Sequence, residues 1–258
     1  MWPKEHGAYG QLAFPLVTAF AVAGISPAAA LTALAAVAAF VAHEPVLVLL
    51  GRRGARARRN QGSQAARWLA ACAIIGVTAG AAALWVAPAY VRWAFWVPLV
   101  PVSVVAVALA TGREKSTLGE VAVALAFSAI AIPVSVVGGS TPATAVSIST
   151  AFGILFAAST LSVRVVILKV RGGGNPRAVR MTRTMLFVLS ASAALAMSVA
   201  VTAAYTSAAM AVAVIPGLVL SLVLAARPPA PARLRTVGWA LVSTSALTAV
   251  VLIAALPR

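Results

Sequence analysis

Long apolar stretches separated by short polar segments dominate this chain. Each stretch is close to the roughly 20 residues that an α-helix needs to cross the hydrocarbon core of a bilayer. Nine spans are predicted, at residues 9–25, 29–50, 68–87, 93–112, 118–137, 142–165, 185–204, 207–226 and 237–256. The pattern therefore predicts an all-α polytopic membrane protein whose 258 residues form a single transmembrane domain.

The composition excludes several other classes of protein. Hydrophobic residues make up 62% of the chain and charged residues only 9%, whereas a soluble domain carries about a quarter of charged residues. A disordered chain and a water-soluble enzyme are therefore excluded. The single Cys72 rules out a disulfide framework and cysteine-based metal clusters, and two histidines cannot build a three-histidine zinc site. We expect no metal and no cofactor.

The net charge of +16 would suggest nucleic acid in a soluble protein, but here the basic residues lie between the spans. When the connections are assigned alternately to two sides, all but two of the 20 basic residues fall on one side. That side holds the N-terminus and residues 51–67, 113–117, 164–184 and 227–236, and the other side holds Arg92 and Arg258. The positive-inside rule then predicts a protein of the bacterial inner membrane, with a cytoplasmic N-terminus, an external C-terminus and lipid as its partner.

Two features of the chain leave alternatives open. The first span ends in Ala21-Val22-Ala23, which would also suit cleavage of a signal peptide, although Glu5 and His6 do not suit its basic beginning. A short motif also repeats at an offset of 109 residues, because Lys4-Glu5-His6 with Gly10-Gln11 matches Arg113-Glu114-Lys115 with Gly119-Glu120. The repeat predicts two parallel four-helix units, residues 1–112 and 113–226, followed by a last helix at 237–256.

Ionisable residues inside a predicted span are the first candidates for function, because they are costly in hydrocarbon. Glu44 lies between His43 and Pro45, six residues before the end of the second span, which places it about 9 Å inside the membrane. Pro45 disfavours helical geometry at Glu44 and frees a backbone carbonyl. We expect Glu44 to face the interior and either to pair with a cation or to hold a proton. Arg164 is the nearest candidate cation by depth, and we expect Glu44, His43, Glu120 and Arg164 to converge in one cavity near its cytoplasmic mouth. A structural ion pair beside an ordinary proline kink is the alternative.

Two further groups of residues complete the candidate site. The segment before the first span combines Glu5 and His6, which are suited to acid–base chemistry, with Lys4, which can hold an anion. Basic residues that follow the second and sixth spans can bind phosphate oxygens. The candidate catalytic residues are Glu44, His43, His6 and Glu5, and the candidate substrate-binding residues are Lys4, Arg52, Arg53, Glu120, Arg164 and Lys169. Attraction to lipid headgroups, a flexible N-terminal lead-in and a helix-dipole role for Glu120 are the competing explanations.

The segment Pro3-Lys4-Glu5-His6-Gly7-Ala8-Tyr9, together with His43-Glu44-Pro45, resembles the YwiC-like family of bacterial integral membrane proteins. The resemblance is strongest over the first fifty residues and implies a membrane location without a particular activity. The nine-helix arrangement is also similar, more weakly, to the UbiA-type intramembrane prenyltransferases. That resemblance implies a magnesium-bridged diphosphate held by aspartates, but this chain contains no aspartate.

Three functions therefore stay open. The first is a cytoplasm-facing cavity that binds or modifies an anionic amphiphile, such as a prenyl or lipid phosphate, without a metal. The second is a proton-coupled secondary transporter in which Glu44 and His43 carry the proton. The third is a membrane assembly or scaffold protein that has no small-molecule site.

Overall fold

A computed structural model describes residues 6–170, 175–203 and 208–257 of the chain. Within these residues the secondary structure is entirely helical. The α-helices are α1 (His6–Ala23), α2 (Pro27–Leu49), α3 (Ala55–Val86), α4 (Leu99–Ala110), α5 (Thr117–Ala129), α6 (Ala131–Gly138), α7 (Pro142–Val170), α8 (Pro176–Thr202), α9 (Ala208–Ala226) and α10 (Leu234–Ala255). Two 3₁₀-helices, η1 (Ala89–Trp96) and η2 (Pro231–Arg233), precede α4 and α10.

The helices confirm an all-α polytopic membrane protein. Among the described residues, eight helical segments are long and apolar enough to cross a bilayer, and α1 adds a shorter apolar helix over Gly7–Ala23. Each predicted span corresponds to one of these segments. The fourth span consists of η1 followed by α4, and the fifth consists of α5 followed by α6.

Two basic segments that we expected to be loops are largely helical. Residues 51–67 were expected to connect two spans, but α3 already begins at Ala55. The expected connection at 164–184 is also shorter, because α7 continues to Val170 and α8 begins at Pro176. The 55–67 segment is rich in alanine, arginine and glutamine, which are strong helix formers. A count of apolar residues detects the part of a helix inside the membrane and misses a polar continuation outside it.

Prolines inside the spans have different effects. In the fifth span the helix is interrupted at Ile130, between α5 and α6. Pro133 lies at the position whose missing N–H would have bonded the carbonyl of Ala129, so the interruption follows from the proline. By contrast, α2 continues without interruption through Pro45 to Leu49. The expectation that Pro45 would disfavour helical geometry at Glu44 was therefore wrong, because membrane helices tolerate proline where neighbouring groups compensate for the lost bond.

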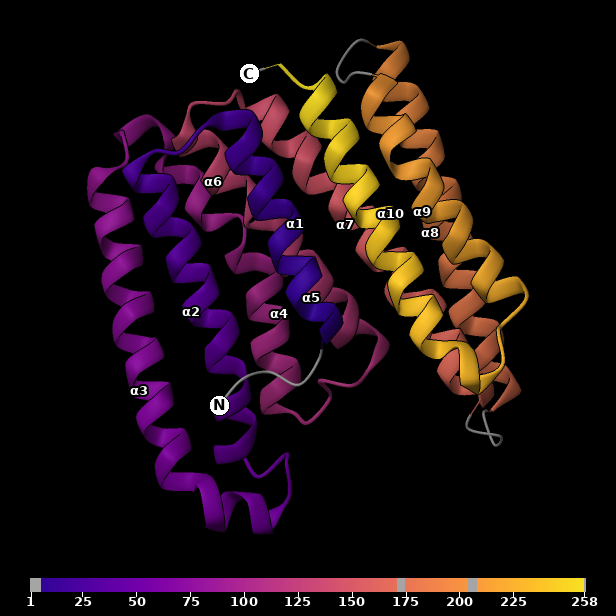
Figure 1. Cartoon of the computed structure of the whole chain (residues 1–258), viewed down its shortest axis with the longest axis horizontal. Coiled ribbons are helices and arrows are strands. Elements are labelled where there is room, and N and C mark those ends of the chain that lie inside the picture. Colours follow the sequence, from indigo (N-terminus) through magenta and orange to yellow (C-terminus); the bar gives the residue numbers. More distant parts are fainter. Residues whose placement is uncertain (1–5, 171–174, 204–207, 258) are drawn as a thin grey trace.

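Helix α7 forms the centre of the bundle. It packs against α1, α5, α6, α8, α9 and α10, and its Phe152, Leu155 and Phe156 are among the most deeply buried side chains. Helix α3, by contrast, packs chiefly against α2 and lies at one edge of the molecule, while α8, α9 and α10 form the opposite edge (Figure 1).

Small residues allow the helices to approach closely, as is typical of membrane proteins. A Cβ at Gly217 of α9 would lie 1.9 Å from Cδ1 of Leu155 in α7. On the other side of the bundle, Gly76 and Gly80 of α3 face the Cβ atoms of Ala38 and Ala35 in α2 at van der Waals distance. Helices α2 and α3 are therefore closely packed at Gly76 and Gly80.

The two ends of the bundle differ in charge. The basic end carries the turns at 50–54 and 111–116, the end of α7 and the start of α8. The far end carries the connections at 24–26, 87–98 and 139–141. All the basic residues that the structure describes lie toward the basic end, except Arg92 in η1.

Candidate functional site

Glu44 forms a bidentate ion pair with Arg53 near the end of α2. The Nε atom of Arg53 donates to Oε1 of Glu44 at 2.9 Å, and its Nη2 atom donates to Oε2 at 2.5 Å. Glu44 is only 6% exposed, whereas the side chain of Arg53 is 30% exposed. Glu44 thus faces the protein interior and has a cation as its partner, but that cation is Arg53 and not Arg164.

The α2–α3 turn explains why Arg53 reaches Glu44. Gly51 and Gly54 adopt positive φ values of 72° and 96°, a conformation that residues with a side chain rarely adopt. The chain therefore reverses within a few residues after α2, and Arg53 lies beside the last turns of that helix. The turn therefore places Arg53 closer to the Glu44 carboxylate than an arginine of another helix, such as Arg164.

An aromatic cluster lies next to the Glu44–Arg53 pair. Phe40 is four residues before Glu44, which places it on the same side of α2 and one turn deeper. Its ring contacts the rings of Tyr9 in α1 and Phe127 in α5, with centroids 5.1 and 5.5 Å apart. These edge-to-face contacts connect three helices beneath the buried carboxylate. Sequence reasoning did not identify Phe40 and Phe127, because ring contacts between distant helices leave no local signal.

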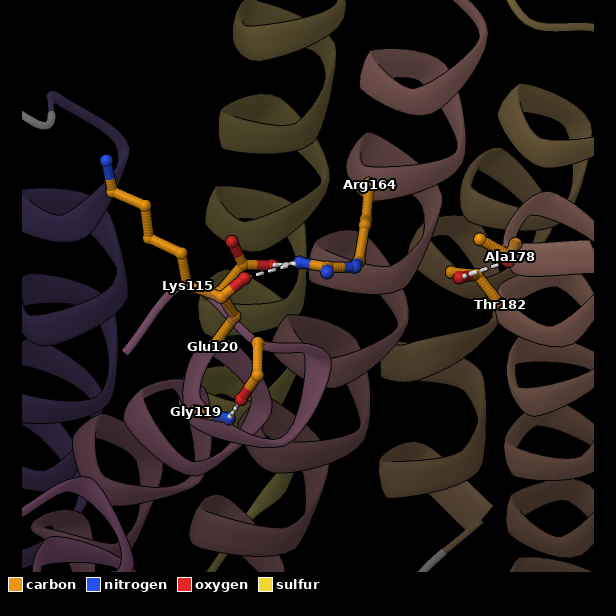
Figure 2. Close-up of polar contacts among 7 residues, drawn as sticks. Lys115, Gly119, Glu120, Arg164, Ala178 and Thr182 are labelled. Atoms are coloured by element: carbon orange, nitrogen blue, oxygen red, sulfur yellow. Dashed lines mark hydrogen bonds and ion pairs between the residues drawn. The ribbon is translucent and has the colours of Figure 1, made fainter. Parts of the chain in front are cut away.

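Glu120 and Arg164 form a second ion pair, between α5 and α7 (Figure 2). Nη1 of Arg164 donates to Oε2 of Glu120 at 2.8 Å and to the backbone carbonyl of Lys115 at 3.0 Å. The Lys115 side chain points away from the guanidinium (Figure 2). Ser116 caps α5 by accepting a hydrogen bond from the amide of Gly119, so the turn that carries the Lys115 carbonyl is fixed.

Arg52 connects the two turns of the basic end. Its Nη2 atom lies 3.4 Å from the carbonyl oxygen of Leu109, in the last turn of α4. A cation in this position stabilises the negative end of the helix dipole. Gly112 lies directly against it, since a Cβ there would be 2.7 Å from Nη1 of Arg52. Arg52 therefore holds the α2–α3 turn against the α4–α5 turn.

The predicted site thus consists of two separate ion pairs, each with its own carboxylate. The hydrogen bonds between Glu44 and Arg53 have no residue in common with those that Arg164 makes to Glu120 and Lys115. His43 is half-buried on α2 next to Glu44, and Lys169 is exposed in the last turn of α7. The predicted convergence of Glu44, His43, Glu120 and Arg164 in one cavity remains a prediction.

The predicted N-terminal residues Lys4 and Glu5 lie outside the described residues. His6 begins α1, but its side chain also lies outside the described part. The acid–base hypothesis for Glu5 and His6 therefore stays a prediction.

The side chains that are placed favour anions as ligands. In the part of the chain that the structure describes, no three His, Cys, Asp or Glu side chains gather as ligands for a metal ion. Two of the four acidic residues of the chain, Glu44 and Glu120, are already bound to arginines. The basic end carries guanidinium and ammonium groups, which are donors of the kind that phosphate and carboxylate oxygens accept from.

Comparison with known proteins agrees with this membrane architecture. The family model described as YwiC-like protein matches residues 2–135, which include α1, α2 and both acidic members of the ion pairs. No curated protein and no solved structure matches the chain. Because the family match covers more than half of the sequence, the chain belongs to the YwiC-like family of membrane proteins.

Proposed function

We propose that this protein binds the phosphate group of an anionic amphiphile, such as a prenyl or lipid phosphate, at its basic end. In this proposal the protein lies in the bacterial inner membrane and the basic end faces the cytoplasm, as the charge distribution predicts.

The observation that carries the proposal is the incomplete use of the Arg164 guanidinium. Both of its hydrogen bonds, to Glu120 and to the Lys115 carbonyl, come from Nη1. Within the described residues, its Nε and Nη2 atoms make no hydrogen bond or ion pair. The side chain is 24% exposed, so a ligand can reach these two donors. Guanidinium groups present such paired N–H donors to two oxygens of a phosphate.

The positioning of Arg164 supports the same function. Two protein acceptors hold one edge of the guanidinium, so little side-chain freedom is lost when the other edge binds a ligand. Arg164 also lies near the end of α7, where a headgroup can reach it while the apolar chain stays beside the helices. This arrangement suits an amphiphile better than a free anion.

The surrounding charge supports an anion as the ligand. Lys115 and Lys169 are both exposed and have no ion-pair partner in the described part of the chain. Each cation near the surface adds about 1 kcal/mol of attraction for an anionic headgroup. Glu114 and Glu120 oppose this attraction only partly, because the basic end carries more cations than carboxylates.

The test compares ligand retention by two arginine variants. The protein and its Arg164→Ala and Arg59→Ala variants are purified in a mild detergent, and native mass spectrometry identifies the ligands that stay bound. Arg59 is an exposed arginine of α3, a helix that packs chiefly against α2, so Arg59→Ala removes the same charge elsewhere. We expect a phosphate-containing amphiphile on the parent and on Arg59→Ala, and its loss from Arg164→Ala. Equal losses from both variants would contradict the proposal.

A titration then separates the sources of the phosphate group. Delipidated protein receives farnesyl diphosphate, phosphatidylglycerol or inorganic phosphate. Binding of farnesyl diphosphate alone indicates a prenyl phosphate as the ligand. Binding of phosphatidylglycerol alone indicates a lipid headgroup. Binding of inorganic phosphate with equal affinity would show that the apolar chain contributes nothing, and would contradict an amphiphile site.

A second candidate function is proton-coupled transport, which the burial of Glu44 favours. A carboxylate that is 6% exposed inside a proline-containing helix can exchange its arginine partner for a proton. In proteoliposomes, this function predicts that Glu44→Gln abolishes proton-coupled movement and leaves ligand binding intact. Loss of binding with Glu44→Gln would favour a purely structural role for the pair.

A further inference from the structure

Exposed aromatic side chains form one edge of η1 at the far end of the bundle. A 3₁₀-helix has three residues per turn, so Tyr90, Trp93 and Trp96 lie one above another, and all three are exposed. Val91 and Ala94 form another edge and are buried against α2, α6 and α7. Tyrosine and tryptophan gather at the level where hydrocarbon meets headgroups. We therefore place η1 at the membrane interface.

An open recess of about 630 Å³ lies between η1 and the end of α3. Ala81, Leu84 and Trp85 of α3 form one wall, and Arg92 of η1 forms the other. Leu84 and Trp85 follow Ala81 by three and four positions, so both lie on the same face of α3 as Ala81. Trp85 is 86% exposed. The recess is thus apolar along α3 and carries one positive charge at η1.

The recess runs from the interface toward the hydrocarbon. Ala81 precedes the last residue of α3, Val86, by five positions, which places Ala81 about 7.5 Å deeper along the helix. Arg92 lies beyond that end, in the interfacial η1. An occupant would therefore meet a cation at the surface and an apolar wall below it. This order of polar and apolar groups is the order found in a phospholipid.

Arg92 has donors available for such an occupant. Its Nε atom donates to the carbonyl of Ala87 at 3.2 Å, which fixes the direction of the side chain. Its two terminal nitrogens make no hydrogen bond or ion pair with any described residue. None of the described acidic residues lies at the far end, because Glu44, Glu114 and Glu120 all belong to the basic end.

We propose that this recess binds an anionic phospholipid from the leaflet at the far end, with its phosphate on the terminal nitrogens of Arg92. One acyl chain lies along Leu84 and Ala81, and the indole of Trp85 covers the glycerol region. The site is independent of Arg164 and of the function proposed for the basic end.

The charge distribution argues against other occupants. A second copy of this chain that packed its own recess against this one would bring two Arg92 side chains together, with no described carboxylate at this end to separate their charges. A zwitterionic lipid carries a cation that Arg92 repels. An anionic headgroup satisfies the arginine and leaves no charge unpaired.

The test uses tryptophan fluorescence in nanodiscs that contain lipids with brominated acyl chains, which quench nearby indoles. A variant that retains only Trp85 has the other five tryptophans replaced by phenylalanine. Brominated phosphatidylglycerol should reach half-maximal quenching at a mole fraction about fivefold lower than brominated phosphatidylcholine does, as one cation–headgroup contact predicts. Arg92→Gln should make the two lipids equal, and Arg92→Lys should keep part of the preference.

Trp239 provides the matched control. It is an exposed tryptophan of α10 near the basic end. In a variant that retains only Trp239, Arg92→Gln should therefore leave the quenching by both brominated lipids unchanged. Equal quenching of Trp85 by both lipids, or a preference that survives Arg92→Gln, would overturn the proposal. If the single-tryptophan variants do not fold, native mass spectrometry of the full chain measures phosphatidylglycerol adducts directly, and equal adducts with and without Arg92→Gln would overturn it as well. Displacement by inorganic phosphate would indicate a free anion site instead.

Discussion

Arg53 reaches back over the α2–α3 turn and neutralises the buried carboxylate of Glu44 with two hydrogen bonds. Such a pair is costly to break from one side, because the remaining charge keeps its desolvation cost and loses its partner. It therefore holds the turn in one conformation. Arg52, the neighbouring residue, then contacts the end of α4 from a fixed position.

Glu44→Gln and Arg53→Gln should each lower the stability of the folded protein. Arg53 is 30% exposed, so water compensates part of the loss and each variant should lose about 1–2 kcal/mol. The double variant should lose less than the sum of the two, because the second substitution removes the charge that the first left unpaired. Thermal unfolding in detergent measures all three, with Arg59→Gln as the control. Additive losses would show that the two side chains do not stabilise each other.

Gly217→Ala should destabilise the contact between α9 and α7. The new Cβ would lie 1.9 Å from Cδ1 of Leu155, and this buried side chain has to change rotamer, at a cost of about 1–3 kcal/mol. Gly238→Ala in α10 is the matched control, because a Cβ there meets no atom within 4 Å. The control should leave stability unchanged or raise it by up to about 1 kcal/mol. A similar unfolding temperature for both variants would contradict the close approach of α9 and α7.

The proposed sidedness can be tested by labelling single cysteines in a Cys72→Ser background. Asn60 of α3 and Ala89 of η1 are both exposed and belong to opposite ends of the bundle. In intact cells, an impermeant maleimide should label Ala89→Cys and should label Asn60→Cys only after permeabilisation. The reverse pattern would place the basic end outside and would remove the argument for a cytoplasmic ligand.

The sequence was most informative about the membrane spans and least informative about the contacts between them. Apolar segments identify each span because the hydrocarbon core imposes both length and composition. The polar start of α3 at Ala55 lies outside that constraint and was not recognised. The proposed duplication of 1–112 and 113–226 concerns the relation between helices and stays a prediction.

The arginine partners of Glu44 and Glu120 show the same limit. Energetic cost alone predicts that Glu44 faces inward and finds a cation. The choice of Arg53 depends on the backbone conformation of Gly51 and Gly54, which the hydrophobic pattern does not encode. The pairing of Glu120 with Arg164 depends on how α5 packs against α7, and this also cannot be read from either helix alone.

Glu120→Gln provides the most direct test of the proposed phosphate site. Glu120 occupies Nη1 of Arg164 and offsets its charge, so neutralising it should strengthen the binding of an anionic headgroup about fivefold. Arg164→Ala should abolish the same binding. The measurement is the dissociation constant of the co-purified amphiphile, determined on delipidated protein for the parent and both variants. Opposite changes in the two variants are the result that we predict, and equal weakening in both would show that the Glu120–Arg164 pair only stabilises the fold.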